Sequence, residues 1–84
     1  MTALTVRFFA SLREAVGFGD LNIEVDPPTL AGLRSALATT LTPEQFRAID
    51  MADVRIAVNQ AIVQGETPLR AGDEVAFLPR VTGG

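Results

Sequence analysis

The chain has 84 residues, of which 48% are hydrophobic and 20% are charged, a balance typical of one small folded domain. It contains no Cys, His, Trp or Tyr, and all 7 of its cationic side chains are Arg. This composition excludes disulfides, thiolate or imidazole metal sites, and a catalytic nucleophile that depends on His, Cys or Lys. A net charge of −3 has the wrong sign for binding a phosphate backbone, so we expect no nucleic-acid partner.

The beginning of the chain gives no sign of a targeting segment. Residues 1–17 have no basic stretch followed by an unbroken apolar run, as a signal peptide would. Elsewhere the sequence never approaches the ~18 consecutive apolar residues of a membrane span. We therefore expect a cytoplasmic protein with no membrane partner.

The first part of the chain predicts a strand, a short helix and a second strand. Residues 3–9 alternate between the two faces of a strand. Residues 10–16 are good helix formers and are followed by a glycine, which is where a helix usually ends. Residues 21–26 alternate again, and the Pro27-Pro28 pair then prevents the strand from continuing.

Two helix start signals follow. Thr29 is a good N-cap, and leucines recur at spacings of three and four residues after it, which predicts the main helix over 30–40. Thr42 is the second capping residue, because proline follows it directly and Gln45 stands where a capping box requires it. We expect this shorter helix to end near Ile49.

The last part of the chain predicts three more strands. Residues 54–63 form two β-rich runs around a polar Asn59-Gln60 turn, and residues 74–79 alternate once more until a proline stops the sheet. This order predicts an α+β protein with one mixed sheet of about five strands and one main helix packed on one face. The β-grasp, or ubiquitin-like, fold fits it best. We expect a folded domain over 1–79 and a flexible tail over 80–84.

The closing Gly83-Gly84 pair is the feature that points to chemistry. After the sheet ends, five residues span at most about 17 Å, and two glycines make the end of this tail narrow enough for a deep pocket in another protein. The α-carboxylate of Gly84 would be the working group: it would attack the α-phosphate of ATP, and a sulfur or nitrogen nucleophile would open the resulting acyl-adenylate. The alternative is an ordinary disordered terminus. The other tail residues are Arg80, Val81 and Thr82.

Apolar residues on the solvent side of the sheet predict a docking patch. Because Leu4, Val6 and Phe8 are expected to face the helix, Phe9 and Leu78 fall on the opposite face, where an exposed aromatic ring is costly unless a partner covers it. The predicted partner-binding residues are Phe9, Ile62 and Leu78. The alternative is that the short helix or a loop folds over Phe9.

Four segments of the chain resemble the MoaD family, the small subunit of molybdopterin synthase: VRFFASLREAVG, VRIAVNQ, PLRAGDEVAFLP and VTGG. The resemblance implies a sulfur carrier that is not an enzyme on its own. An E1-like adenylyltransferase would activate Gly84 with ATP, and a sulfur donor such as a cysteine desulfurase or rhodanese-like protein would convert it to a thiocarboxylate. Arg80 departs from the family, which often has a second proline there.

The resemblance also implies the acceptor of the sulfur. The tail would enter the large subunit of the synthase, in an expected heterotetramer, and pass sulfur to cyclic pyranopterin monophosphate to form the dithiolene of molybdopterin. No metal site is expected, and ATP would be consumed by the activating enzyme rather than held as a cofactor.

Three other functions stay open at this stage. The chain is compatible with a ThiS-like sulfur carrier for another pathway. It is also compatible with a protein modifier, in which a lysine amine of a target attacks the activated Gly84 to give an isopeptide bond. Because the chain has no Lys, such a modifier would not form chains on its own side chains. The third possibility is an interaction domain with an inert tail.

Overall fold

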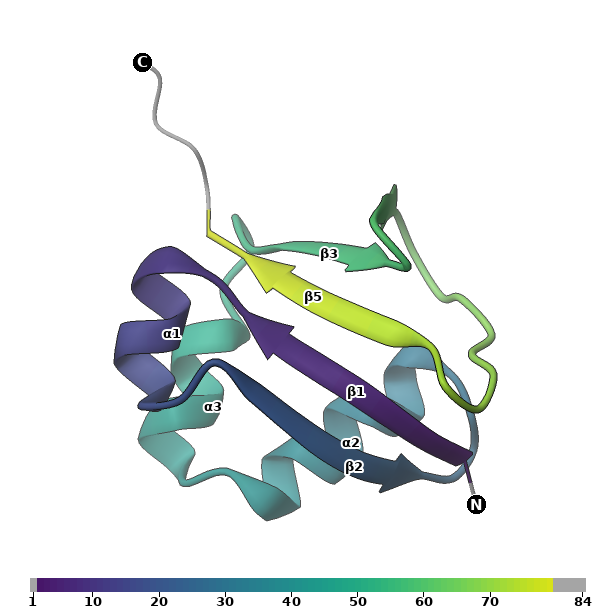
Figure 1. Ribbon diagram of the computed structural model, residues 1–84. Coiled ribbons are helices and arrows are strands. Elements are labelled where there is room, and N and C mark those ends of the chain that lie inside the picture. Colours follow the sequence, from purple (N-terminus) through teal and green to yellow (C-terminus); the bar gives the residue numbers. More distant parts are fainter. Residues whose placement is uncertain (1, 80–84) are drawn as a thin grey trace.

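Five strands form one mixed sheet in the computed structural model, which describes residues 2–79 (Figure 1). The strands are β1 (Thr2–Phe8), β2 (Asp20–Val25), β3 (Arg55–Val58), β4 (Ala61–Val63) and β5 (Glu74–Leu78). Their spatial order is β2-β1-β5-β3-β4, with β1 and β5 parallel at the centre and the other neighbours antiparallel. The predicted α+β, β-grasp fold is confirmed.

Three helices complete the fold: α1 (Ala10–Val16), α2 (Leu30–Thr40) and α3 (Pro43–Ile49). Both capping predictions hold. The Thr29 hydroxyl accepts a hydrogen bond from the Gly32 N–H at 3.0 Å, and Thr42 forms a reciprocal capping box with Gln45. The Gln45 side chain also donates to the Val16 carbonyl at 2.6 Å, which links α3 to the end of α1.

The hydrophobic core lies between the sheet and α2. Alternation along β1 buries Leu4, Val6 and Phe8, and alternation along β5 buries Val75 and Phe77 on the same side. The leucine stripe of α2 covers them with Leu30, Leu33 and Leu37. Because the core takes one face of the central strands, their other side chains point to the opposite face of the sheet.

The loop between β4 and β5 is fixed to the start of α2. Leu69 is buried in the core, and its N–H donates to the Pro28 carbonyl at 2.7 Å. Gly32 packs so closely beneath the preceding loop that a methyl group built on it would collide with the carbonyl oxygen of Pro27. The sequence predicted neither contact, because the first joins segments that are far apart in the chain and the second depends on how the loop before α2 folds back over the first turn of that helix.

The β3–β4 turn is tied to the beginning of β5 by one side chain. Asn59 and Gln60 both have positive φ, 50° and 72°, as the predicted two-residue turn requires. The Asn59 amide donates to the Asp73 carboxylate at 2.9 Å, and its carbonyl oxygen accepts the Glu74 N–H at 3.0 Å. This clasp joins the AVNQ and GDEV segments and holds β3 in register with β5.

Candidate docking surface

The face of the sheet that points away from α2 carries a row of residues set by strand register. Ile62 of β4 lies opposite Ala57 of β3, Ala57 lies opposite Ala76 of β5, and Ala76 lies beside Arg7 of β1. Residues paired across a ladder point to the same face of a sheet. The row therefore runs from the apolar edge strand to an arginine at the centre.

A second row lies nearer the end of β5. Leu78 pairs with Arg55 of β3, and the Phe9 N–H donates to the carbonyl of Phe77 at 3.2 Å, which places Phe9 beside Leu78. The guanidinium of Arg7 lies 5.2 Å from the centre of the Phe9 ring, so Phe9 shares the face of Arg7. We use the name docking surface for Phe9, Ala57, Ile62, Ala76 and Leu78.

Exposure varies across this surface. Ile62 is 53% exposed, whereas Phe9 and Leu78 are half-buried. Ala57 and Ala76, between the larger side chains, are only 4% and 5% exposed. The structure thus brings the three predicted partner-binding residues to one face. Phe9 is only half-buried, and the Arg7 guanidinium lies over its ring.

Charged side chains border the docking surface. Arg7 forms an ion pair with Glu74 at 3.8 Å and also lies over the Phe9 ring. Arg55 is exposed and takes part in neither of the two ion pairs found within residues 2–79, which are Arg7–Glu74 and Arg34–Asp50. The sequence analysis did not select Arg55. The alternation of Arg55 with Ile56 along the strand is a signal that Arg55 lies on the outer face. Its position beside Leu78, however, follows only once the order of the strands is known.

Asp73 lies directly before β5 and carries a carboxyl group whose pKa is shifted. The side-chain hydrogen bond from Asn59, and then the N–H of Arg70 at 2.8 Å, hold the pKa of the Asp73 carboxyl below its ordinary value. A carboxylate satisfied by donors at a turn is a structural group. Its role is to stabilise the clasp between β3 and β5.

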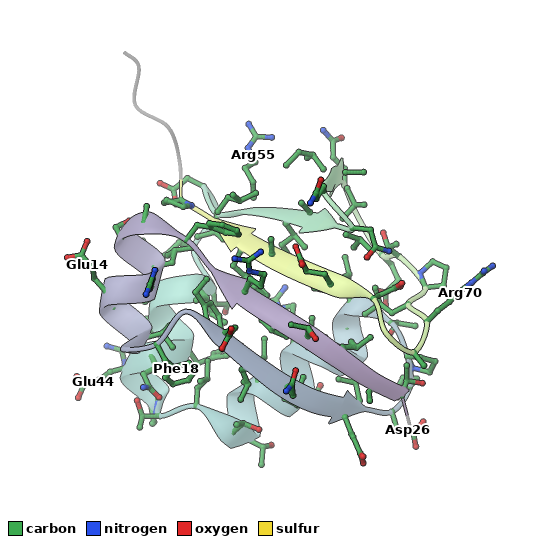
Figure 2. The ribbon with its side chains drawn as sticks, viewed as in Figure 1. Glu14, Phe18, Asp26, Glu44, Arg55 and Arg70 are labelled. Atoms are coloured by element: carbon green, nitrogen blue, oxygen red, sulfur yellow. The ribbon has the colours of Figure 1, made fainter. Side chains whose placement is uncertain are left out.

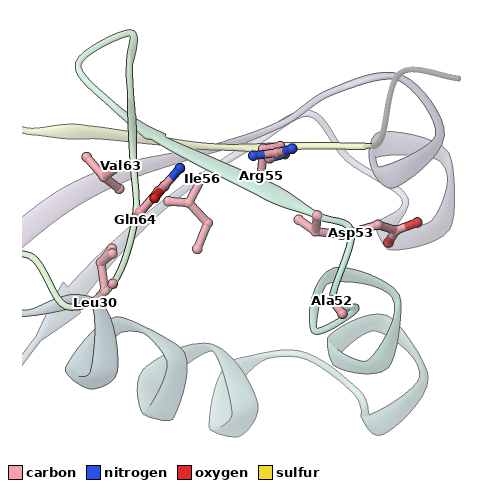
Figure 3. Close-up of a pocket in the computed structure, with 9 residues that line it drawn as sticks. Leu30, Ala52, Asp53, Arg55, Ile56, Val63 and Gln64 are labelled. Carbon is pink, nitrogen blue, oxygen red and sulfur yellow. The ribbon is translucent and has the colours of Figure 1, made fainter. Parts of the chain in front are cut away.

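A hollow of about 600 Å³ lies beside the sheet edge, between the start of α2, β3 and the segment after β4 (Figure 3). Its lining is mixed: Leu30, Ile56 and Val63 contribute apolar surface, and Gln64 contributes polar surface. Asp53 and Arg55 are the charged residues among those that line it, and the lining has no Ser, Thr, Cys, His or Lys. The hollow therefore offers no nucleophile with an adjacent base.

Residues 2–79 also lack the other common signs of a catalytic centre. They contain no cluster of three or more His, Cys, Asp or Glu side chains that would hold a metal ion. Within the same residues, no helix is long and apolar enough to cross a membrane. The predicted reactive tail, Arg80 to Gly84, lies outside the described residues. The docking surface ends at Leu78, two positions before that tail begins.

Comparisons with known sequences give a family match over most of the chain. The sequence model of the ThiS family matches residues 6–84. The molybdopterin synthase sulfur carrier subunit of Escherichia coli (strain K12) is 41% identical over 81 residues, which cover 96% of this chain and 99% of that protein. The matched part includes both the docking surface and the terminal glycines.

Solved structures share the whole fold. A complex of subunits 1 and 2 of the molybdopterin-converting factor from Helicobacter pylori contains a chain that is 27% identical, with a TM-score of 0.74 over 99% of this chain and 100% of that one. The small archaeal modifier protein 1 from Methanosarcina acetivorans is also 27% identical, with a TM-score of 0.79 over 100% of this chain and 98% of that one.

Proposed function

The chain belongs to the ThiS family, and from this membership we propose that it is the sulfur-carrier small subunit of a molybdopterin synthase. Its 41% identity to a carrier subunit over nearly the full length of both chains is the observation that carries the proposal. The chain does not turn over by itself. Partners supply the catalytic groups, which agrees with the lack of a nucleophile–base pair in the hollow of residues 2–79.

The reacting group in this proposal is the carboxylate of Gly84. One of its oxygens attacks the α-phosphate of ATP on an E1-like adenylyltransferase, so that an acyl-adenylate forms and pyrophosphate leaves. The outer sulfur of a persulfide on a cysteine desulfurase or rhodanese-like donor then displaces AMP to give an acyl disulfide. A thiol of the partner proteins attacks the S–S bond of this acyl disulfide, so that a new disulfide forms on the thiol and the chain leaves as a thiocarboxylate. ATP is a substrate of the activating enzyme, and the chain itself holds no cofactor.

The docking surface presents the carrier to the large subunit of the synthase. Phe9, Ile62 and Leu78 supply apolar contact area, and the small side chains between them leave the centre flat enough for a partner to approach closely. β5 leads directly into the tail, so a partner that covers Leu78 receives the segment Arg80–Gly84 next to the contact. The large subunit would then pass the sulfur of Gly84 to cyclic pyranopterin monophosphate, in a heterotetramer.

Intact mass spectrometry tests the proposal. The protein is incubated with ATP, the adenylyltransferase and a sulfur donor, and we expect a mass gain equal to the exchange of one oxygen for sulfur at Gly84. A variant that lacks Gly84 is the control. It should show no such gain and should unfold like the wild type, because the core lies within residues 4–77. No mass change in the wild type, or transfer by the truncated variant, would refute the proposal.

A protein modifier is the second candidate, favoured by the 27% identity to the small archaeal modifier protein 1. The same acyl-adenylate of Gly84 would then react with a lysine amine of a target, with loss of AMP. The same incubation, with cell proteins added, separates the two functions. Adducts of this chain on other proteins, in place of the sulfur-containing free chain, would favour the modifier.

A further inference from the structure

Arg55 is the charged residue that the strand register places next to Leu78 of the docking surface. It pairs across the ladder with Leu78 and stands two residues before Ala57 on the same face of β3. Figure 3 shows its side chain on the opposite side of β3 from Ile56, which points towards α2. A partner that covers Leu78 therefore also meets the guanidinium of Arg55.

Among residues 2–79, no carboxylate forms an ion pair with this guanidinium. Arg7, the other arginine of this face, is paired with Glu74 and lies over the Phe9 ring. Within residues 2–79 the second ion pair, Arg34–Asp50, lies on the helical side of the sheet, and Arg55 is in neither pair. With respect to the described part of the chain, its N–H donors are therefore available to a group on another molecule.

Covering an unpaired guanidinium with apolar surface is unfavourable. A charge that is buried without a partner loses its hydration and gains nothing in return, whereas a carboxylate that receives two parallel N–H donors from arginine offsets that loss. Arginine is also enriched at the energetically important positions of protein interfaces, because its planar fork fixes geometry as well as charge. An acidic group opposite Arg55 would therefore stabilise a complex that covers this arginine.

We propose that Arg55 is a specificity-determining residue of the docking surface, and that the large subunit presents an Asp or Glu carboxylate to it, next to the apolar contact made with Leu78. This inference rests on the proposed function, since it specifies the chemistry of that partner. The net charge of the whole chain is −3, so a carboxylate on a partner is repelled by the chain as a whole. Next to Arg55 the same carboxylate is attracted by the guanidinium. The ion pair selects the partner and fixes the direction in which β5 leads the tail into it.

Calorimetry with the purified large subunit tests the inference. Arg55→Gln should weaken the complex about 30-fold or more, the usual loss when one member of a covered charge pair is removed. Arg55→Lys should give an intermediate loss, because it keeps the charge and loses the fork. The matched control is Arg70→Gln, since Arg70 is also exposed but lies in the β4–β5 loop, at a different end of the molecule (Figure 2). It should leave the affinity within about twofold of the wild type, as expected for an arginine outside the contact.

Two further measurements make the result specific. The affinity of the wild type should fall more steeply with salt than that of Arg55→Gln, and Arg55→Glu should regain binding when the opposing carboxylate of the large subunit is replaced by Arg. Equal affinities of the wild type and Arg55→Gln, with unchanged thermal unfolding, would overturn the inference while the proposed function stands. Failure of the wild type to bind the large subunit would overturn both.

Discussion

Replacing Asn59 with Ala should destabilise the fold more than its exposed position in a turn suggests. The side chain makes two hydrogen bonds, one to the Asp73 carboxylate at 2.9 Å and one from the Glu74 N–H at 3.0 Å. The residue also has a φ of 50°, a conformation that asparagine tolerates much better than alanine. The substitution therefore removes the clasp between β3 and β5 and strains the turn.

The expected loss follows from these two contributions. Each of the partly exposed hydrogen bonds contributes about 0.5–1 kcal/mol, and alanine in the left-handed region costs about 1 kcal/mol. Asn59→Ala should thus lower the free energy of unfolding by about 2–3 kcal/mol, out of the roughly 4–13 kcal/mol expected for a chain of this length. Asn59→Gly is the matched control, because it loses the hydrogen bonds and keeps the backbone conformation at little cost. It should lose about 1–2 kcal/mol.

Urea unfolding at pH 7, followed by circular dichroism, measures both variants. The reasoning fails if neither variant differs from the wild type, because the clasp would then contribute nothing. It also fails in part if Asn59→Gly is as unstable as Asn59→Ala, since the strain at positive φ would then be absent. A changed denaturant slope would show that the substitution acts on the unfolded chain instead.

Acid unfolding gives an independent check on the same clasp. Hydrogen bonds from Asn59 and the Arg70 N–H lower the pKa of Asp73 from 3.8. The stability from the ionised carboxylate is therefore complete above that unfolded-state value and is lost as pH falls through the lower pKa of the folded state. In Asn59→Gly the pKa of Asp73 should move back towards its ordinary value, and less stability should be lost on acidification. Carbon-detected NMR titration of the Asp73 carboxyl measures the change, and an unmoved pKa would contradict it.

Two more substitutions test the docking surface and the loop packing. Phe9→Asp should weaken the complex with the large subunit tenfold or more, because it places a charge in an apolar contact. Phe18→Asp, in the α1–β2 loop, is the control and should not weaken it. If calorimetry finds equal affinities for the wild type and Phe9→Asp, Phe9 is not part of the docking surface. Gly32→Ala should cost about 1–3 kcal/mol in urea unfolding, because its methyl group collides with the Pro27 carbonyl. Gly19→Ala is its control, since the methyl group there meets only the movable Arg13 side chain, at 3.1 Å; equal stability of the two variants would contradict the predicted clash.

Local signals in the sequence predicted every helix and strand, because each depends on neighbouring residues. The alternation in β1, the Thr29 cap and the Asn59-Gln60 turn are examples, and all three are confirmed. Two features of the packing were missed because no periodic pattern encodes them. The burial of Leu69 depends on how the β4–β5 loop meets the distant loop before α2, and the close approach at Gly32 depends on how the loop before α2 folds back over that helix.

For the docking surface too, the sequence predicted what local alternation determines and missed what depends on the strand order. Period-two alternation placed Phe9 and Leu78 on the outer face, since it needs only the strand itself. The neighbours of Leu78 depended on the strand order, because Arg55 would lie away from Leu78 if β3 did not pair with β5. The strand order therefore placed the charge of Arg55 beside the predicted docking residues, which are all apolar.

The position of the docking surface along the chain also explains how a carrier without catalytic groups delivers its cargo. Leu78 is the last residue of β5, and the six residues from Pro79 to Gly84 reach at most about 22 Å. A partner that holds Leu78 and Arg55 thus confines Gly84 to its own surroundings, which turns delivery into an event within one complex, at millimolar effective concentration. In the proposed function, contacts on the strands would supply the selectivity, and the terminal segment would supply the chemistry. Weakening the docking surface should therefore slow sulfur delivery even when Gly84 carries its sulfur.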